Sequence, residues 1–153
     1  MRILRTFLFI STILLMNIML ASAQPDQPIS ISITNINANQ QIKKGMPYFE
    51  ISGIVSGLPP QDYQNYKVIV YVHTDLWYVY PYARQGEGKS WASIQANGRW
   101  QIQSSVQREF KADKVAAVLV KRNSPELSFT KTLEKMQKAA IVVKELRGTP
   151  DLW

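Results

Sequence analysis

The side chains that could support catalysis are few in this chain and do not form a recognisable site. His73 is the only histidine, and the chain has no cysteine. A histidine-based triad would therefore have to use His73, with Asp62 or Asp75 orienting it toward a serine, whereas a histidine-rich or thiolate zinc site is excluded. We expect His73, which ends a predicted strand, to hydrogen-bond within its own turn, because neighbours in sequence do not make triad geometry.

Carboxylates are the remaining groups that could support hydrolysis. Glycoside hydrolysis needs two carboxylates roughly 5 to 10 Å apart across a cleft. Asp62, Asp75 and Glu87 all lie in predicted loops near an aromatic segment, but no motif places two of them on adjacent strands. We therefore predict a protein that is not an enzyme, without catalytic residues, metal or cofactor. A small carboxylate-based hydrolase is the least favoured hypothesis.

Aromatic residues form the strongest candidate for a binding site. Nine of them lie between Tyr63 and Trp100. Exposed rings can stack on the apolar faces of sugars, and the polar tips of Tyr and Trp can contact hydroxyl groups. We predict a ligand-binding surface made of Trp77, Tyr78, Tyr80, Tyr82 and Trp91.

The alternation of side chains along a strand limits which of these rings can act together. Trp77 and Val79 share one face, and Tyr78 and Tyr80 share the other. Packing on an edge strand explains the tyrosines equally well, because tyrosine is a good strand former. Trp100 alternates with Ile102 after a tight turn and is assigned to the core.

The elements that must position these side chains are predominantly strands. Alternating or continuous apolar patterns predict them at residues 29–36, 48–56, 66–73, 76–80, 91–94, 100–103, 115–120 and 141–143. The strands at 66–73 and 115–120 are apolar on both parities and are expected to be central. Asn97-Gly98 favours a tight hairpin turn between 91–94 and 100–103. Gly53 and Gly57 indicate a bulge or a close backbone crossing.

One short helix is expected near the C-terminus. Ser124-Pro125-Glu126 has the order of an N-cap, a first-position proline and an acidic first turn, and apolar residues then recur at helical spacing up to Ala140. We predict an all-β fold, an Ig-like antiparallel β-sandwich of about seven strands with this helix as a lid. An open barrel of oligosaccharide-binding topology is the alternative.

The order of these motifs resembles a family of bacterial secreted β-sandwich modules. The units that carry the resemblance are Tyr66-Lys67-Val68-x-Val70-Tyr71-Val72, Trp77-Tyr78-Val79-x-Pro81-Tyr82, Ile94-x-x-Asn97-Gly98-x-Trp100 and Ala116-Ala117-x-Leu119-Val120. The family comprises Ig-like or fibronectin-like accessory modules found alone or beside carbohydrate-active domains. The resemblance implies a binding role near polysaccharide and supplies no catalytic residues.

The N-terminal residues have the composition of a cleavable signal peptide. Arg2 and Arg5 precede an uncharged apolar region from Phe7 to Leu20, and Ala21-Ser22-Ala23 gives a small-x-small cleavage pattern. We expect a signal peptide at 1–23, a leader at 24–28, one domain at 29–148 and a tail at 149–153. The apolar region is shorter than the roughly 20 residues that span a bilayer, so no integral span is expected after cleavage. The protein is expected to be exported and to be secreted or periplasmic.

The number and distribution of charged residues limit the kinds of partner that the protein can bind. Basic residues exceed acidic ones, 18 against 11 in the full chain, but they are scattered rather than gathered into the stripe that nucleic-acid binding requires. The function we predict is a secreted, non-catalytic β-sandwich binding module that engages extracellular or envelope polysaccharide through its aromatic surface. The alternative is a protein-protein interaction or structural module of the cell envelope.

Overall fold

Two antiparallel β-sheets make up the described part of the chain. The computed structural model describes residues 27–43, 46–80, 90–105 and 112–146. The first sheet has the order β1 (Ser30–Lys43), β2 (Met46–Ser56) and β6 (Arg99–Ser105). The second has the order β8 (Phe129–Thr130), β4 (Trp77–Val79), β3 (Tyr66–His73), β7 (Lys114–Lys121) and β9 (Ala140–Glu145), and β5 (Trp91–Ala92) also pairs with β3.

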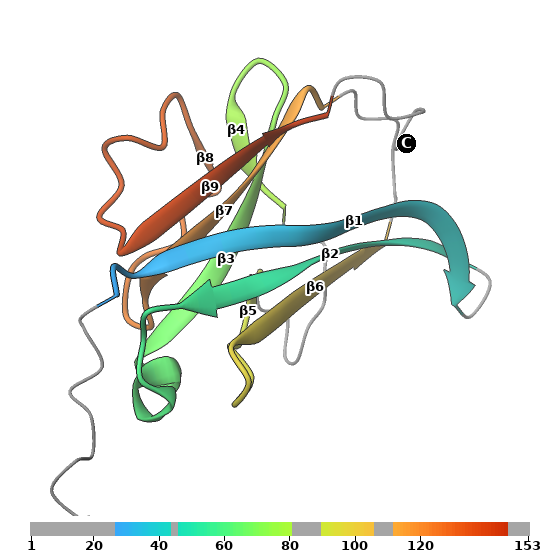
Figure 1. Cartoon of the computed structure of the whole chain (residues 1–153). Coiled ribbons are helices and arrows are strands. Elements are labelled where there is room, and N and C mark those ends of the chain that lie inside the picture. The colour runs from blue at the N-terminus through green and yellow to red at the C-terminus, as the bar shows by residue number, and fades with distance from the viewer. Residues whose placement is uncertain (1–26, 44–45, 81–89, 106–111, 147–153) are drawn as a thin grey trace, which may run out of the picture.

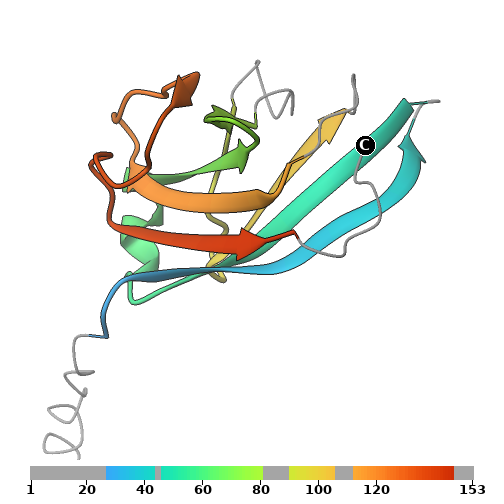
Figure 2. The ribbon, with the colours of Figure 1, turned by 90° about the horizontal axis from the view of Figure 1, so that it is seen from above.

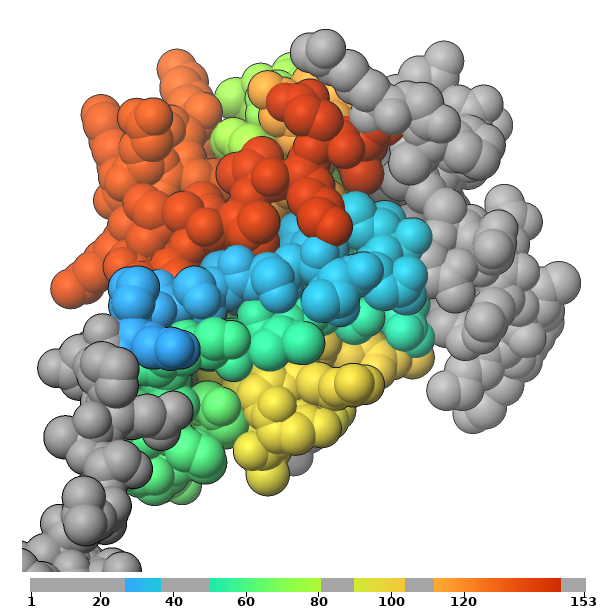
Figure 3. Space-filling view, viewed as in Figure 1, coloured from blue at the N-terminus to red at the C-terminus, as the bar shows by residue number. Residues whose placement is uncertain are grey.

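The two sheets lie face to face around one apolar core, as the sequence predicts. Figures 1 and 2 show the layers, with β9 of the second sheet running beside β1 of the first. Figure 3 shows these two strands in contact on one face of the molecule. We call the side of each sheet that faces this core its inner face, and the opposite side its outer face.

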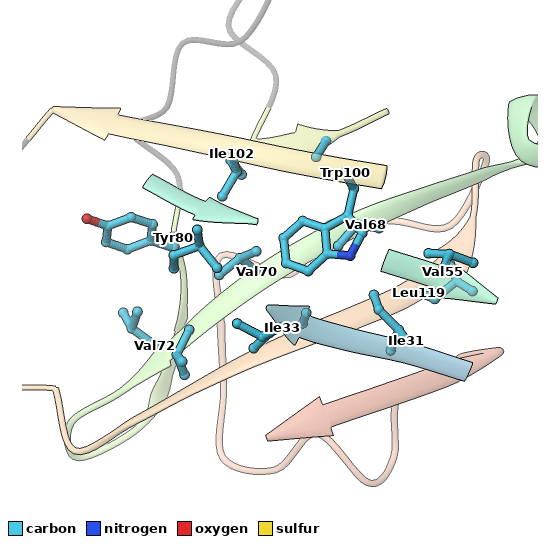
Figure 4. Close-up of a cluster of buried hydrophobic side chains, with 14 of the residues drawn as sticks. Ile31, Ile33, Val55, Val68, Val70, Val72, Tyr80, Trp100, Ile102 and Leu119 are labelled. Atoms are coloured by element: carbon cyan, nitrogen blue, oxygen red, sulfur yellow. The ribbon is translucent and has the colours of Figure 1, made fainter. Parts of the chain in front are cut away.

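Alternate residues of the strands fill the inner core (Figure 4). Val68, Val70 and Val72 of β3 meet Trp100 and Ile102 of β6 there. Trp100 is 1% exposed, so its assignment to the core is confirmed. Period-two alternation places these residues on one face, and sheets packed in this way interdigitate their inner side chains.

A bulge in β1 explains a break in its alternation. Ile33 pairs with Gly53 and Asn35 pairs with Ser52, which leaves Thr34 as the additional residue. A bulge re-aims the side chains that follow it, and Ile36 accordingly packs against the inner core as Ile33 does. The bulge expected near Gly53 is therefore confirmed.

Strands β3 and β7 are central, as predicted, because both faces of their sheet are covered. The outer face carries a second apolar cluster that includes Ile69, Tyr71 and Val118. Leu133 and Met136, from the connection between β7 and β9, cover this cluster. This second layer is why the two strands are apolar on both parities.

The C-terminal helix expected from Ser124 to Ala140 is absent from the structure. Those residues form β8 and a series of turns. The Thr130 hydroxyl donates to the Thr132 carbonyl over 2.8 Å, and the Thr132 side chain accepts from the Glu134 backbone over 3.2 Å. Such local bonds compete with helical ones. The helical element in the described ranges is a 3-10 helix, η1 (Pro60–Asn65).

The turn at Asn97-Gly98 forms as predicted, but the strands on either side of it separate. Gly98 has φ of +78° and donates its backbone N–H to Gln95 over 2.9 Å. β5 then pairs with β3 and β6 pairs with β2, so the turn carries the chain from one sheet to the other. The predicted hairpin between these two strands is wrong.

Candidate functional site

The structure divides the predicted aromatic residues between the two faces of the second sheet. Trp77 pairs with His73 and Tyr78 pairs with Val72, so the alternation along β4 is the one the sequence predicts. Trp77 packs with the outer cluster, whereas Tyr78 and Tyr80 pack with the inner core. Tyr80 is only 7% exposed, and Figure 4 shows its ring between the sheets. Tyr80 therefore offers no ring face to a ligand, and Tyr82 lies outside the described residues.

Trp91 is held against cationic side chains rather than in a row with the tyrosines. It pairs with Ile69 in β5 and packs against the outer cluster. The Arg122 guanidinium lies 4.3 Å from the centroid of its ring, and the Lys67 ammonium lies 5.9 Å away. These are favourable cation-π distances. The ring of Trp91 therefore positions Arg122.

Phe129 joins the candidate site, although its sequence pattern had placed it on a helix. β8 pairs with β4 so that Phe129 is directly opposite Tyr78, with ring centroids 6.3 Å apart. Phe129 is 61% exposed and Tyr78 is half-buried. Together with Trp77 on the other face of the same strand, these two rings form what we call the aromatic edge. The alternation of apolar and polar residues from Leu127 to Thr130 is a short strand signal, but the helical spacing of Phe129 with later apolar residues favours a helix in the sequence.

A carboxylate lies beside the aromatic edge in the turn between β3 and β4. Asp75 accepts a hydrogen bond of 2.8 Å from the Thr74 hydroxyl and a long one of 3.5 Å from the Tyr78 hydroxyl. The bond from Thr74 is the largest cause that lowers the pKa of Asp75. Burial first, and then the charge of Asp75, raise the pKa of Tyr78. Asp75 therefore presents an ionised acceptor next to a neutral phenol.

His73 is paired with a carboxylate that is far from it in the sequence, so the prediction that His73 would hydrogen-bond within its own turn is wrong. Its Nδ1 lies 2.7 Å from Oδ1 of Asp113, and its ring lies 5.0 Å from the ring of Trp77. The hydrogen bonds of the described residues place no serine hydroxyl on His73. Glu87 lies outside the described residues, and in the described ranges no group of three His, Asp or Glu side chains could hold a metal ion.

The segment of residues 122–130 passes from the end of β7 to the edge of β4 and connects the parts of the site. Lys67 is 5% exposed, and its ammonium lies 3.1 Å from Oε1 of Glu126. The other oxygen of Glu126 accepts a hydrogen bond from the Ser90 hydroxyl. The Val79 backbone N–H donates to Ser128 over 3.0 Å. These bonds fix the segment against the sheet and so position both Arg122 and Phe129.

Comparisons of the chain with protein-family models, with curated proteins and with solved structures found no match. The resemblance to secreted accessory modules therefore stays a prediction. In the parts of the chain that the structure describes, no helix is long and apolar enough to cross a membrane. The fold and the side chains described above define the class of the molecule as an all-β protein of two packed antiparallel sheets.

Proposed function

We propose that this protein is an exported, non-catalytic binding module that engages extracellular or envelope polysaccharide through the aromatic edge. Export rests on the signal-like composition of residues 1–23. Binding rests on one observation above the others, which is the cross-strand pair of Tyr78 and Phe129. Phe129, with most of its side chain in solvent, has an exposed ring supported by hydrogen-bonded strands.

The groups around this pair suit the chemistry of sugars. An aromatic ring offers a flat apolar face, and a tyrosine adds a polar tip. The ionised carboxylate of Asp75 can accept hydrogen bonds from sugar hydroxyls, and charge-assisted bonds of this kind are stronger than neutral ones. Because these groups lie on paired strands and a tight turn, little conformational entropy is lost when a ligand binds.

An Ig-like topology is part of the same proposal. The strand order β1-β2-β6 opposite β4-β3-β7-β9 corresponds to A, B and E opposite C′, C, F and G of an Ig-like sandwich. The chain departs from antibody domains because it has no cysteine for an inter-sheet disulfide. Its buried tryptophan, Trp100, lies on the strand that corresponds to E.

The proposal predicts that removing the two rings of the pair weakens retention on polysaccharide. We expect Tyr78→Ala and Phe129→Ala each to weaken binding to an insoluble polysaccharide by about fivefold, since a ring contact is worth about 1 kcal/mol. The double variant should lose more than either single variant. The measurement is a depletion isotherm on the insoluble polymer.

Val143→Ala is the matched control for this experiment. Val143 is also an exposed apolar residue, at 47%, but it lies on β9 at the opposite side of the sheet. This variant should bind like the parent protein. Equal retention of the parent and the double variant would contradict the proposal.

A protein partner is the second candidate ligand, and one observation favours it. Leu127 and Phe129 are both exposed large apolar residues, and β8 is an edge strand of its sheet. Exposed apolar edges are typical of strand-to-strand association. In that case Phe129→Ala would abolish co-purification of a stable partner or a higher solution mass, while retention on polysaccharide would be absent in the parent protein as well.

A further inference from the structure

Arg122 is held in a defined position at the end of β7. Its guanidinium stacks on Trp91 at 4.3 Å, its Nε donates to the Gln64 carbonyl over 3.2 Å, and its backbone N–H donates to Asn65 over 2.8 Å. Arginine is the side chain that stacks on aromatic rings and still presents a planar fork of donors. The side chain therefore pays little additional entropy to meet a ligand.

Among the residues that the structure describes, no carboxylate forms an ion pair with Arg122. Glu126, the carboxylate of the same segment, is taken up by Lys67 and by the Ser90 hydroxyl. In the described part of the chain, the guanidinium nitrogens other than Nε have no hydrogen bond to a protein acceptor. Two or more donors of Arg122 are thus left for an oxygen ligand.

The position of Arg122 relates it to the aromatic edge. Trp91 is opposite Ile69 and Tyr78 is opposite Val72 on the same strand. Three residues along a strand correspond to roughly 10 Å. The segment of residues 122–130 spans this interval, but Ile69 and Trp91 belong to the outer cluster, whereas Val72 and Tyr78 pack with the inner core. A polymer that meets Arg122 beside Trp91 can therefore reach Trp77 of the aromatic edge on the same face, and it reaches Phe129 only by passing around the edge of the sheet.

We propose that Arg122, positioned by Trp91, binds the carboxylate of an acidic polysaccharide, so that the ligand class is a uronic-acid polymer. This inference rests on the proposed function and adds the charge of the ligand to it. A carboxylate fits the guanidinium in the bidentate geometry that makes such pairs strong and specific. A neutral sugar would leave the positive charge without a partner.

The test uses one polymer in two charge states. Polygalacturonate carries carboxylates, and its methyl ester has the same backbone without the charge. We expect the full chain to bind polygalacturonate about tenfold more tightly than the ester, because charge-assisted bonds add to the ring contacts. Arg122→Gln should remove this preference, and Arg122→Lys, which keeps the charge but not the fork, should recover only part of it.

Lys121→Gln is the matched control because it removes the same charge from the neighbouring exposed residue. It should keep the preference. Equal losses in Lys121→Gln and Arg122→Gln would overturn the inference in favour of general charge attraction. A preference for dextran sulfate over dextran that is as large as the preference for polygalacturonate, and that persists in Arg122→Gln, would also overturn the inference in favour of general charge attraction.

The outcomes separate this inference from the proposed function. Equal binding of the parent protein to polygalacturonate and its ester overturns the carboxylate site and leaves polysaccharide binding standing. Binding to both forms that is unaffected by the double variant of Tyr78 and Phe129 overturns the aromatic edge. Binding to neither polymer overturns the carboxylate site. Circular dichroism and thermal melting of each variant establish that the fold is intact.

Discussion

At the residue scale, Tyr71 is a buried phenol whose hydroxyl is poorly satisfied. It is 0% exposed, and its hydroxyl has no hydrogen bond of ordinary geometry to the described residues. Burial raises the pKa of Tyr71 to about 12, the nearby Leu127 backbone opposes this effect and the charge of Glu126 adds to it. The hydroxyl therefore costs free energy where it lies.

We expect Tyr71→Phe to be neutral or to stabilise the fold by up to about 1 kcal/mol at pH 7. The pKa of Tyr71 in the folded protein lies above its value of about 10 in the unfolded chain. The contribution of this raised pKa to the stability of the fold is therefore present below pH 10 and is lost as the pH rises toward 12. The variant should gain stability relative to the parent protein across that interval. Urea unfolding at pH 7, 10 and 11 measures this, and a clear loss of stability at pH 7 would show that the hydroxyl has a partner.

His73 and Asp113 form a link with the opposite dependence on pH. Partial burial alone would raise the pKa of Asp113, but the hydrogen bond and the charge of His73 outweigh it and hold this pKa below its ordinary value. A lowered folded pKa gives stability above the unfolded pKa of about 3.9, and this stability is lost as the pH falls through the folded value.

We therefore expect Asp113→Asn to be less stable than the parent protein at pH 5, and the two proteins to converge as the pH falls below about 3.9. The difference in free energy of unfolding between the two proteins should shrink steadily on acidification. Asp75→Asn serves as a comparison, because Asp75 also has a lowered pKa but its side chain bonds to Thr74 and Tyr78, which are close to it in the sequence. A difference that stays constant down to pH 2 would contradict the assignment.

At the element scale, the contact between β1 and β2 depends on a residue without a side chain. A Cβ on Gly53 would lie 1.8 Å from the Ser32 carbonyl oxygen and 2.6 Å from the Trp100 ring. One of these obstacles is backbone, and the other is a fully buried ring in the centre of the core. Neither can move without disturbing both the bulge and the inner packing.

Gly53→Ala should accordingly destabilise the fold by about 3 kcal/mol or more, at the upper end of the effects of overpacking. Chemical denaturation with tryptophan fluorescence is a suitable measurement, because Trp100 would report the disturbance directly. Ser56→Ala, an exposed position at the end of the same strand, is the control and should change stability by less than about 0.5 kcal/mol. A Gly53→Ala variant as stable as the control would show that the close contact is relieved.

The connection between β7 and β9 shows how an element can be misjudged from local pattern. Its N-cap residues and its apolar spacing are typical of a helix. In the structure Leu133 and Met136 use the same spacing to cover the outer face of the second sheet. The segment keeps an irregular path because the pair of Lys67 and Glu126 fixes it to β3. Tertiary contacts overrode the local preference here.

At the scale of the whole molecule, two apolar layers on one sheet organise both the stability and the site. The inner core joins the sheets, and the outer cluster joins the second sheet to the connection above it. Among the candidate ligand groups, Trp77 and Trp91 pack against this outer layer, whereas Tyr78 packs with the inner core and pairs with Phe129 at the edge of the sheet. Binding and stability therefore involve neighbouring residues, and each binding variant needs its own stability measurement.

The sequence by itself determined most of the strands and the central position of β3 and β7, because period-two alternation and apolar runs on both parities are local properties. It assigned β8 to a helix, and it ended the first strand at residue 36, whereas β1 continues to Lys43. It also determined the turn at Gly98 and the burial of Trp100. The tertiary structure alone decided that β5 pairs with β3, that Tyr80 is buried and that Phe129 is exposed. These outcomes depend on which distant segment covers each face, and no local pattern encodes that choice.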